Sequence, residues 1–172
     1  MRKKTNKLPG VYLLPNLVTS GALFCGFYSI ITAIAGNYVL ATIYILFAMI
    51  LDGLDGRVAR MTNTQTSFGE YFDSLSDMLC FGVAPALLIY LSSLSMFTSG
   101  YLAKISYIAC FIYIASTAIR LARFNSRNQT TDKKYFMGLA SPAAAAILIC
   151  YVWLMQDLGV VIQSYVTLTV IL

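Results

Sequence analysis

Five of the seven acidic residues of this chain lie between positions 52 and 77, in segments that are otherwise largely apolar. They are Asp52, Asp55, Glu70, Asp73 and Asp77, and the basic residues between them are Arg57 and Arg60. Carboxylates inside a membrane are costly and normally pair with cations. With five acidic and two basic side chains, this region lacks three positive charges. We therefore expect it to bind a divalent metal ion.

The spacing of the four aspartates indicates how they meet. Asp52 and Asp55 are three residues apart, and Asp73 and Asp77 are four apart, so each pair shares one face of a helix. The polar connection between the two helices is short, which predicts antiparallel neighbours whose carboxylates converge. An all-oxygen site suits Mg²⁺ or Mn²⁺ better than zinc or copper. Two such ions, about 4 Å apart, clamp the attacking and leaving oxygens in phosphoryl transfer.

Spacing alone leaves two other interpretations open. The aspartates could form ion pairs with Arg57 and Arg60, or line the ion path of a transporter. The chain has no histidine, which excludes imidazole catalysis and zinc sites with histidine ligands. Its four cysteines lie singly in apolar stretches, so we expect them to be small packing residues.

The composition indicates the elements that must position these groups. Hydrophobic residues make up 59% of the chain and charged residues 11%, against about 25% charged in a soluble domain. This excludes a water-soluble globule and predicts one membrane domain over residues 1–172, with a basic segment at 1–10. Apolar stretches cover 16–36, 38–60, 70–95, 101–122, 139–157 and 159–172. We expect an all-α bundle of six transmembrane helices, the last being a tilted terminal helix or an incomplete span because it rises only about 21 Å.

The basic residues predict the orientation of this bundle. They cluster before the first span, at the end of the second and after the fourth, which six helices place on one side. The positive-inside rule makes that side cytosolic, so both termini and the carboxylates should face the cytosol from the cytoplasmic (inner) membrane. Lys104 alone lies on the other side, where it can snorkel. A cleaved signal ending at Ala33-Ile34-Ala35 is disfavoured because its apolar core is too long.

The acidic region also carries a family resemblance. Its residues fit DxxDGxxARx8GxxxDxxxD at all eight fixed positions, from Asp52 to Asp77. This pattern resembles the signature of the CDP-alcohol phosphotransferases, and the six-helix topology is similar too. The resemblance implies transfer of a phosphatidyl or similar group from a CDP-linked donor to an alcohol, with release of CMP. It also suggests a homodimer, for which Ala22 and Gly26 offer one contact between small residues.

The resemblance further implies roles for single residues. Asp52, Asp55, Asp73 and Asp77 should hold two divalent cations, Mg²⁺ or Mn²⁺, and Asp77 should also be the general base. The residues expected to bind the nucleotide of the donor are Asn16, Thr19, Gly56, Ala59, Arg60, Thr66 and Gly69. From the residues alone, the glycines serve equally well for tight helix packing, and Asn16 serves as a helix cap.

The acceptor alcohol is suggested by two further runs. Arg120 to Asn125 and Gly138 to Ala145 are similar to the phosphatidylserine synthase branch of the family, except for Ala140, where that branch usually has proline. This implies CDP-diacylglycerol and L-serine as substrates, in contact with membrane lipids. Arg120, Arg123 and Asn125 would bind the acceptor or a phosphate, although the arginines also fit as topology-setting charges. Ser141 and Pro142 fit as the N-cap and first residue of the fifth span.

Two other acceptors and one other class of protein remain as alternatives. The same chemistry could use glycerol 3-phosphate or inositol phosphate, whose phosphate the basic group from Arg120 to Lys134 could bind. A cation-coupled transporter is the alternative from another class, although the chain has no second acidic motif and no internal repeat. No nucleic-acid partner is expected.

Overall fold

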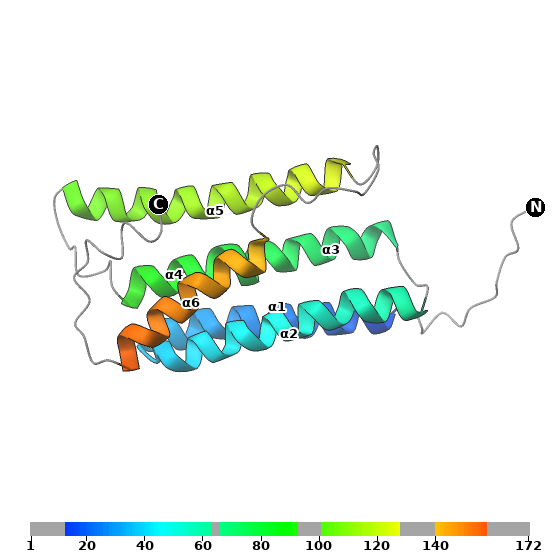
Figure 1. Cartoon of the computed structure of the whole chain (residues 1–172), viewed down its shortest axis with the longest axis horizontal. Helices are drawn as coiled ribbons and strands as arrows, with labels where there is room; N and C mark the ends of the chain where they lie inside the picture. The colour runs from blue at the N-terminus through cyan, green and yellow to red at the C-terminus, as the bar shows by residue number, and fades with distance from the viewer. Residues whose placement is uncertain (1–12, 63–65, 93–100, 128–139, 158–172) are drawn as a thin grey trace, which may run out of the picture.

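The computed structural model describes residues 13–62, 66–92, 101–127 and 140–157, which form a bundle of helices running along its long axis (Figure 1). In chain order these are α1 (Leu13–Ile34), α2 (Tyr38–Thr62), α3 (Ser67–Asp77), the π-helical segment η2 (Met78–Val83), α4 (Ala84–Ser92), α5 (Tyr101–Arg127) and α6 (Ser141–Asp157). Because α3, η2 and α4 follow one another directly, they act as one long helix in the middle of the bundle.

Four helical stretches in the described part of the chain are long and apolar enough to cross a membrane. They are Leu14–Ile34, Tyr38–Thr62, Ser67–Ser92 and Lys104–Ser126, and they correspond to the first four predicted spans. The fifth predicted span corresponds to α6, whose apolar part, Ser141–Leu154, is shorter. The sixth, at 159–172, and the basic segment 1–10 lie outside the described residues. The prediction of an all-α protein with membrane-spanning helices is thus confirmed for these four.

The hairpin of α1 and α2 forms one side of the bundle. The break between the predicted stretches 16–36 and 38–60 is found, with Gly36 in the left-handed conformation at φ 81°. Its N–H donates to the carbonyl of Ala33, and the N–H of Asn37 donates to the carbonyl of Thr32 at 2.9 Å. This pair of hydrogen bonds closes the end of α1 and turns the chain back into α2. The two helices are therefore antiparallel, as the short connection requires.

The long middle helix contains a π-helical turn between its polar and apolar halves. Pro85 follows this turn, and since proline has no N–H it disturbs the hydrogen-bond ladder one turn earlier. The carbonyl of Phe81 accepts a hydrogen bond from the hydroxyl of Tyr113 in α5, at 2.9 Å. A polar side chain of a neighbouring helix thus supports the backbone where the regular pattern changes, beginning directly after Asp77.

Two small residues bring α1 close to the middle helix. Ala22 and Gly26 are buried, and the thiol of Cys80 donates to the carbonyl of Ala22 at 3.3 Å. A Cβ atom added to Gly26 would lie 2.6 Å from the sulfur of Cys80 and 3.2 Å from its Cα. The prediction that Ala22 and Gly26 offer a contact between two subunits is therefore wrong, because η2 occupies this face within the chain.

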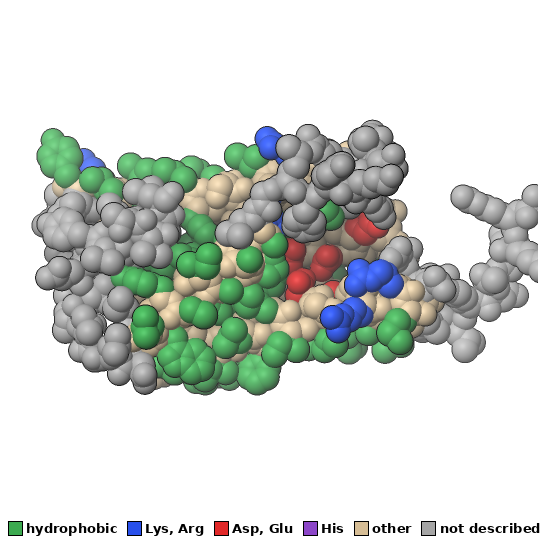
Figure 2. Space-filling view, in the orientation of Figure 1, with side chains coloured by type: hydrophobic (Ala, Val, Ile, Leu, Met, Phe, Trp, Pro, Cys, Tyr) green, Lys and Arg blue, Asp and Glu red, His purple; other side chains and the backbone are tan. Residues whose placement is uncertain are grey.

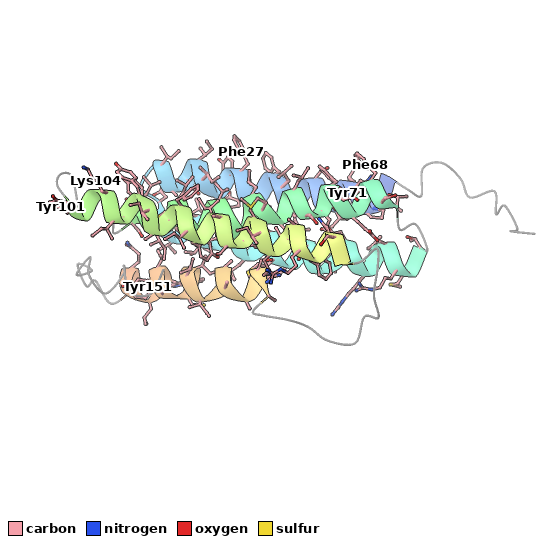
Figure 3. The ribbon with its side chains drawn as sticks, turned by 90° about the horizontal axis from the view of Figure 1, so that it is seen from above. Phe27, Phe68, Tyr71, Tyr101, Lys104 and Tyr151 are labelled. Carbon is pink, nitrogen blue, oxygen red and sulfur yellow. The ribbon has the colours of Figure 1, made fainter. Side chains whose placement is uncertain are left out.

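The outer surfaces of the helices suit lipid. Large apolar side chains such as Leu17, Phe24 and Ile34 of α1 are exposed, and Phe27 points away from the bundle (Figure 3). Lys104 and Tyr101 lie at the opposite end of the bundle from Phe68 (Figure 3). Lys104, which the charge pattern places on the non-cytosolic side, thus lies at the other end of the bundle from the beginning of α3.

The beginning of α6 differs from the expectation by one residue. Ser141 is the first helical residue, and the N–H of Ala144 donates to the carbonyl of Ala140 at 3.0 Å. The hydroxyl of Ser141 is buried and has no hydrogen-bond partner among the described residues. The prediction that Ser141 caps this helix through its side chain is therefore wrong, and Ala140 occupies the cap position instead.

Candidate metal and phosphate site

The aspartates of α2 and α3 meet in one cluster. Asp52, Asp55 and Asp73 each offer a carboxylate oxygen, and these oxygens lie within 4.8 Å of one another. Asp77, one turn after Asp73, shares a side-chain hydrogen bond with Asp52. Figure 2 shows acidic side chains gathered in one place on this face, with hydrophobic side chains covering the helices towards the opposite end. We call these four residues the carboxylate cluster.

The carboxylate cluster is partly buried and lacks a neighbouring cation among the described residues. Asp55 is 4% exposed, and the other three aspartates are partly buried. The charged side chains that act on each of them are other aspartates. In the ranges that the structure describes, no ion pair joins the cluster to Arg57 or Arg60, and both arginines are exposed. The ion-pair interpretation of these aspartates is therefore not supported by the geometry.

The cluster fits a divalent cation. One oxygen of Asp73, Oδ1, is buried and accepts no hydrogen bond from any described residue. A buried carboxylate oxygen without a partner is costly, and a bound ion would supply the missing interaction. Three close carboxylates of this kind can hold a metal, and their oxygens suit a hard cation.

Thr66 fixes where α3 begins, and so where its aspartates lie. Its backbone is extended, and its hydroxyl accepts a hydrogen bond from the N–H of Gly69 at 3.0 Å, the usual geometry of an N-cap. Asp73 and Asp77 follow two and three turns later on the same helix. A contact of Thr66 with a nucleotide stays a prediction, and its observed partner is the helix end.

Gly69 lies where α1 approaches the first turn of α3. A Cβ atom added there would lie 3.2 Å from the hydroxyl of Thr66 and 3.4 Å from Oδ1 of Asn16. The structure therefore brings together three of the residues predicted to bind the nucleotide. A side chain at position 69 would fill the space between the other two.

The remaining residues of the signature lie on α2. Ala59 and Gly56 are partly buried, and the guanidinium of Arg60 lies 3.6 Å from the place of an added Cβ on Gly56. Arg60 is itself exposed. A Cβ atom at position 56 would therefore make only an ordinary van der Waals contact with this arginine, so the structure gives no steric reason for glycine there.

Thr19 of α1 has a role that the sequence did not indicate. Its side chain is 4% exposed, and its hydroxyl donates to Oδ2 of Asp55 at 2.7 Å while lying 3.0 Å from the carbonyl oxygen of Pro15. Ser76, between the two aspartates of α3, lies with its hydroxyl 3.5 Å from the carbonyl of Thr19. The sequence assigned Thr19 to the nucleotide, but its polar contact in the structure orients an aspartate. Nothing in its spacing relates position 19 to position 55.

The residues predicted to bind the acceptor lie on α5. Arg120 is partly buried and Arg123 is exposed. Asn125 is within hydrogen-bonding distance of Ser74, which it meets at 3.0 Å through Nδ2 and 3.2 Å through Oδ1. Ser74 follows Asp73 directly, and the sequence analysis missed it because a lone serine on a helix gives no signal. This contact attaches the end of α5 to the helix of the cluster.

We expect replacement of Thr19 to weaken cation binding more than folding. Thr19→Val keeps the shape but leaves Asp55 without its hydrogen bond, whereas Thr19→Ser retains the hydroxyl. A hydrogen bond to a charged group contributes about 1.5–3 kcal/mol, so the concentration of Mg²⁺ or Mn²⁺ needed for half-maximal thermal stabilisation should rise about tenfold or more in the valine variant only. If both variants titrate like the unaltered protein, Thr19 does not position Asp55.

Comparison with known proteins places the chain among relatives of one family. The sequence model of the family described as CDP-alcohol phosphatidyltransferase matches residues 12–172. The CDP-diacylglycerol–serine O-phosphatidyltransferase of Helicobacter pylori strain 26695 is 43% identical over 145 residues, which cover 84% of this chain and 59% of that protein. The enzyme of the same name from Mycobacterium leprae is 35% identical over 153 residues, covering 86% and 49%.

An archaeal relative is similar to a comparable degree. The archaetidylserine synthase of Methanothermobacter thermautotrophicus is 37% identical over 144 residues, which cover 83% of this chain and 58% of that protein. The chain thus spans between about half and three fifths of the length of these curated relatives.

Proposed function

Since the chain belongs to the CDP-alcohol phosphatidyltransferase family, we propose that it transfers the phosphatidyl group of CDP-diacylglycerol to the hydroxyl of L-serine, giving phosphatidylserine and CMP. The observation that carries this proposal is the carboxylate cluster, in which the four aspartates of the signature meet within one site. The names of the relatives support serine as the acceptor.

In this proposal the carboxylate cluster holds two divalent cations, Mg²⁺ or Mn²⁺. Asp52, Asp55 and Asp73 have the close oxygens that such ions need, and Asp77 is next to them. When bound, the cations neutralise the pyrophosphate of the donor and the charge that develops on the departing CMP. Thr19 keeps Asp55 oriented through its hydrogen bond.

Asp77 is the proposed general base. A serine hydroxyl is a weak nucleophile at neutral pH, and the chain has no histidine to activate it. Asp77 takes the hydroxyl proton as the serine oxygen bonds to the phosphorus that carries diacylglycerol. The bond from that phosphorus to the bridging oxygen breaks, and CMP leaves with the electron pair. Gly69, Thr66 and Asn16 would then border the nucleotide at the start of α3.

The membrane setting suits a lipid donor. The acyl chains of CDP-diacylglycerol can stay among lipids, against the apolar outer surfaces of the helices, while its head group reaches the cluster. We place the site on the cytosolic side of the inner membrane, with both termini on that side, because of the distribution of basic residues. A homodimer would use a surface other than that of Ala22 and Gly26, which pack against η2.

The test is CMP release by purified protein. We expect CMP only when CDP-diacylglycerol, Mg²⁺ or Mn²⁺ and L-serine are all present, with phosphatidylserine as the lipid product. Glycerol 3-phosphate and inositol phosphate are tested in the same way. Release with one of these instead of serine would overturn the acceptor but keep the chemistry. Cation transport into vesicles without any CMP release would favour the transporter.

A further inference from the structure

The first turn of α6 begins inside the bundle, at the level of the carboxylate cluster. Ala48 of α2, Cys80 and Phe81 of η2, and Ala145 of α6 form one buried group. Asp52 lies one helical turn beyond Ala48, and Asp77 about one turn before Phe81, in both cases towards the beginning of α3. Ser141 lies one turn before Ala145 in the same direction. The shared packing therefore puts Ser141 at the depth of Asp52 and Asp77.

The figures agree with this register. In Figure 1 the beginning of α6 lies beside the middle of the long helix, well short of the beginning of α3. In the same orientation, Figure 2 shows the acidic side chains directly beyond this end of α6. The positive end of the dipole of α6 is thus directed towards the site in which the proposed reaction takes place.

The first turn of α6 has backbone N–H groups that form no hydrogen bond within the helix. The first amide that bonds back is that of Ala144, and Pro142 has no N–H, so the amides of Ser141 and Ala143 lack partners within the helix. The side chain of Ser141 is only 4% exposed, and its hydroxyl oxygen has no hydrogen-bond partner among the described residues. A buried hydroxyl without a partner is rare, and it calls for a partner that the described residues do not supply.

We propose that the first turn of α6, through the hydroxyl of Ser141 and the amide of Ala143, binds an anionic oxygen of a substrate opposite the carboxylate cluster. The site rests on the proposed function, since both substrates bring such oxygens: phosphate in CDP-diacylglycerol and carboxylate in L-serine. An anion next to four aspartates needs positive potential on its other side, and a helix N-terminus supplies it. The hydroxyl contacts no aspartate of the cluster, so it does not serve to hold one.

The experiment compares three variants of the full chain. Ser141→Ala removes the hydroxyl, and Ser141→Thr retains one. Ser116→Ala is the matched control, because Ser116 is exposed on α5 and its hydroxyl bonds only within its own helix. For each protein we measure thermal unfolding without ligand and equilibrium binding of CDP-diacylglycerol and of L-serine, which does not depend on turnover.

We expect Ser141→Ala to unfold at the same temperature as the unaltered protein or slightly higher, since no hydrogen bond is lost. Its affinity for one substrate should fall about tenfold or more, the usual effect of losing a hydrogen bond to a charged group. Ser141→Thr should recover most of that affinity. Weaker binding of CDP-diacylglycerol would identify phosphate as the ligand, and weaker binding of L-serine would identify carboxylate.

Two results would overturn the inference. One is unchanged binding of both substrates by Ser141→Ala, and the other is a lower unfolding temperature without a change in binding, which would mean a structural role. Because binding is measured apart from turnover, failure of this inference can be distinguished from failure of the proposed reaction. In the latter case the unaltered protein binds substrate but releases no CMP with any alcohol.

Discussion

Asp77→Asn is expected to abolish CMP release while the protein stays folded. Loss of a general base costs roughly 10²- to 10⁴-fold in rate, since asparagine cannot accept the proton of the attacking hydroxyl. Folding should persist because the amide has the size of the carboxyl group and its N–H can donate a hydrogen bond to Asp52, which is the observed partner of Asp77. Removing one negative charge also relieves repulsion within the carboxylate cluster.

The measurement is the rate of CMP release at saturating donor and serine, together with thermal unfolding of each variant. Glu70→Gln is the matched control, because Glu70 is an exposed acidic residue of α3 outside the cluster. We expect this control to retain the rate of the unaltered protein. Substantial turnover by Asp77→Asn would remove Asp77 from the role of base, and loss of folding would be visible in the unfolding curve.

Removal of divalent cations should abolish activity reversibly. Stabilisation of the developing charge by a bound metal contributes several kcal/mol, so a chelator should lower CMP release by about a hundredfold or more. Addition of Mg²⁺ or Mn²⁺ should restore it. Activity that persists with excess chelator would contradict the assignment of the carboxylate cluster as a metal site.

Cation binding to the carboxylate cluster can also be measured without catalysis, by thermal unfolding. A cation at one hundred times its dissociation constant stabilises the folded protein by about 2.7 kcal/mol, which corresponds to an increase of about 5–10 °C in Tm. Asp73→Asn should lose most of this increase, because the buried Oδ1 of Asp73 that has no described partner is then no longer a carboxylate oxygen. Glu70→Gln should retain it. An equal increase in the Asp73 variant would exclude Asp73 as a ligand.

Much of the site could be predicted from the sequence, because helical periodicity determines which residues share a face. Asp52 and Asp55, and likewise Asp73 and Asp77, were predicted to converge from two antiparallel helices, and the structure has them in one cluster. The break between the first two helices followed from the apolar stretches, one ending at residue 36 and the next beginning at 38, and the structure turns at Gly36. The eight fixed positions of the signature also identified the family, which the match to residues 12–172 confirms.

Contacts between helices that are distant in the chain could not be predicted in this way. Periodicity specifies a face of each helix, but packing decides how far a helix is shifted and rotated against its neighbours. The hydrogen bond of Thr19 to Asp55 and that of Asn125 to Ser74 both depend on that register. The packing of Gly26 against Cys80 of the same chain, rather than against a second subunit, depends on the same register.

The sequence by itself thus determined the helical class, the four long apolar helices and the residues able to hold a cation. The tertiary structure alone decided which groups surround those residues, and at which level of the bundle α6 begins beside them. The physical reason is that apolar helix surfaces are compatible with many registers. The small residues that permit close approach, such as Ala48 and Ala145, select one of them only when all the helices pack together.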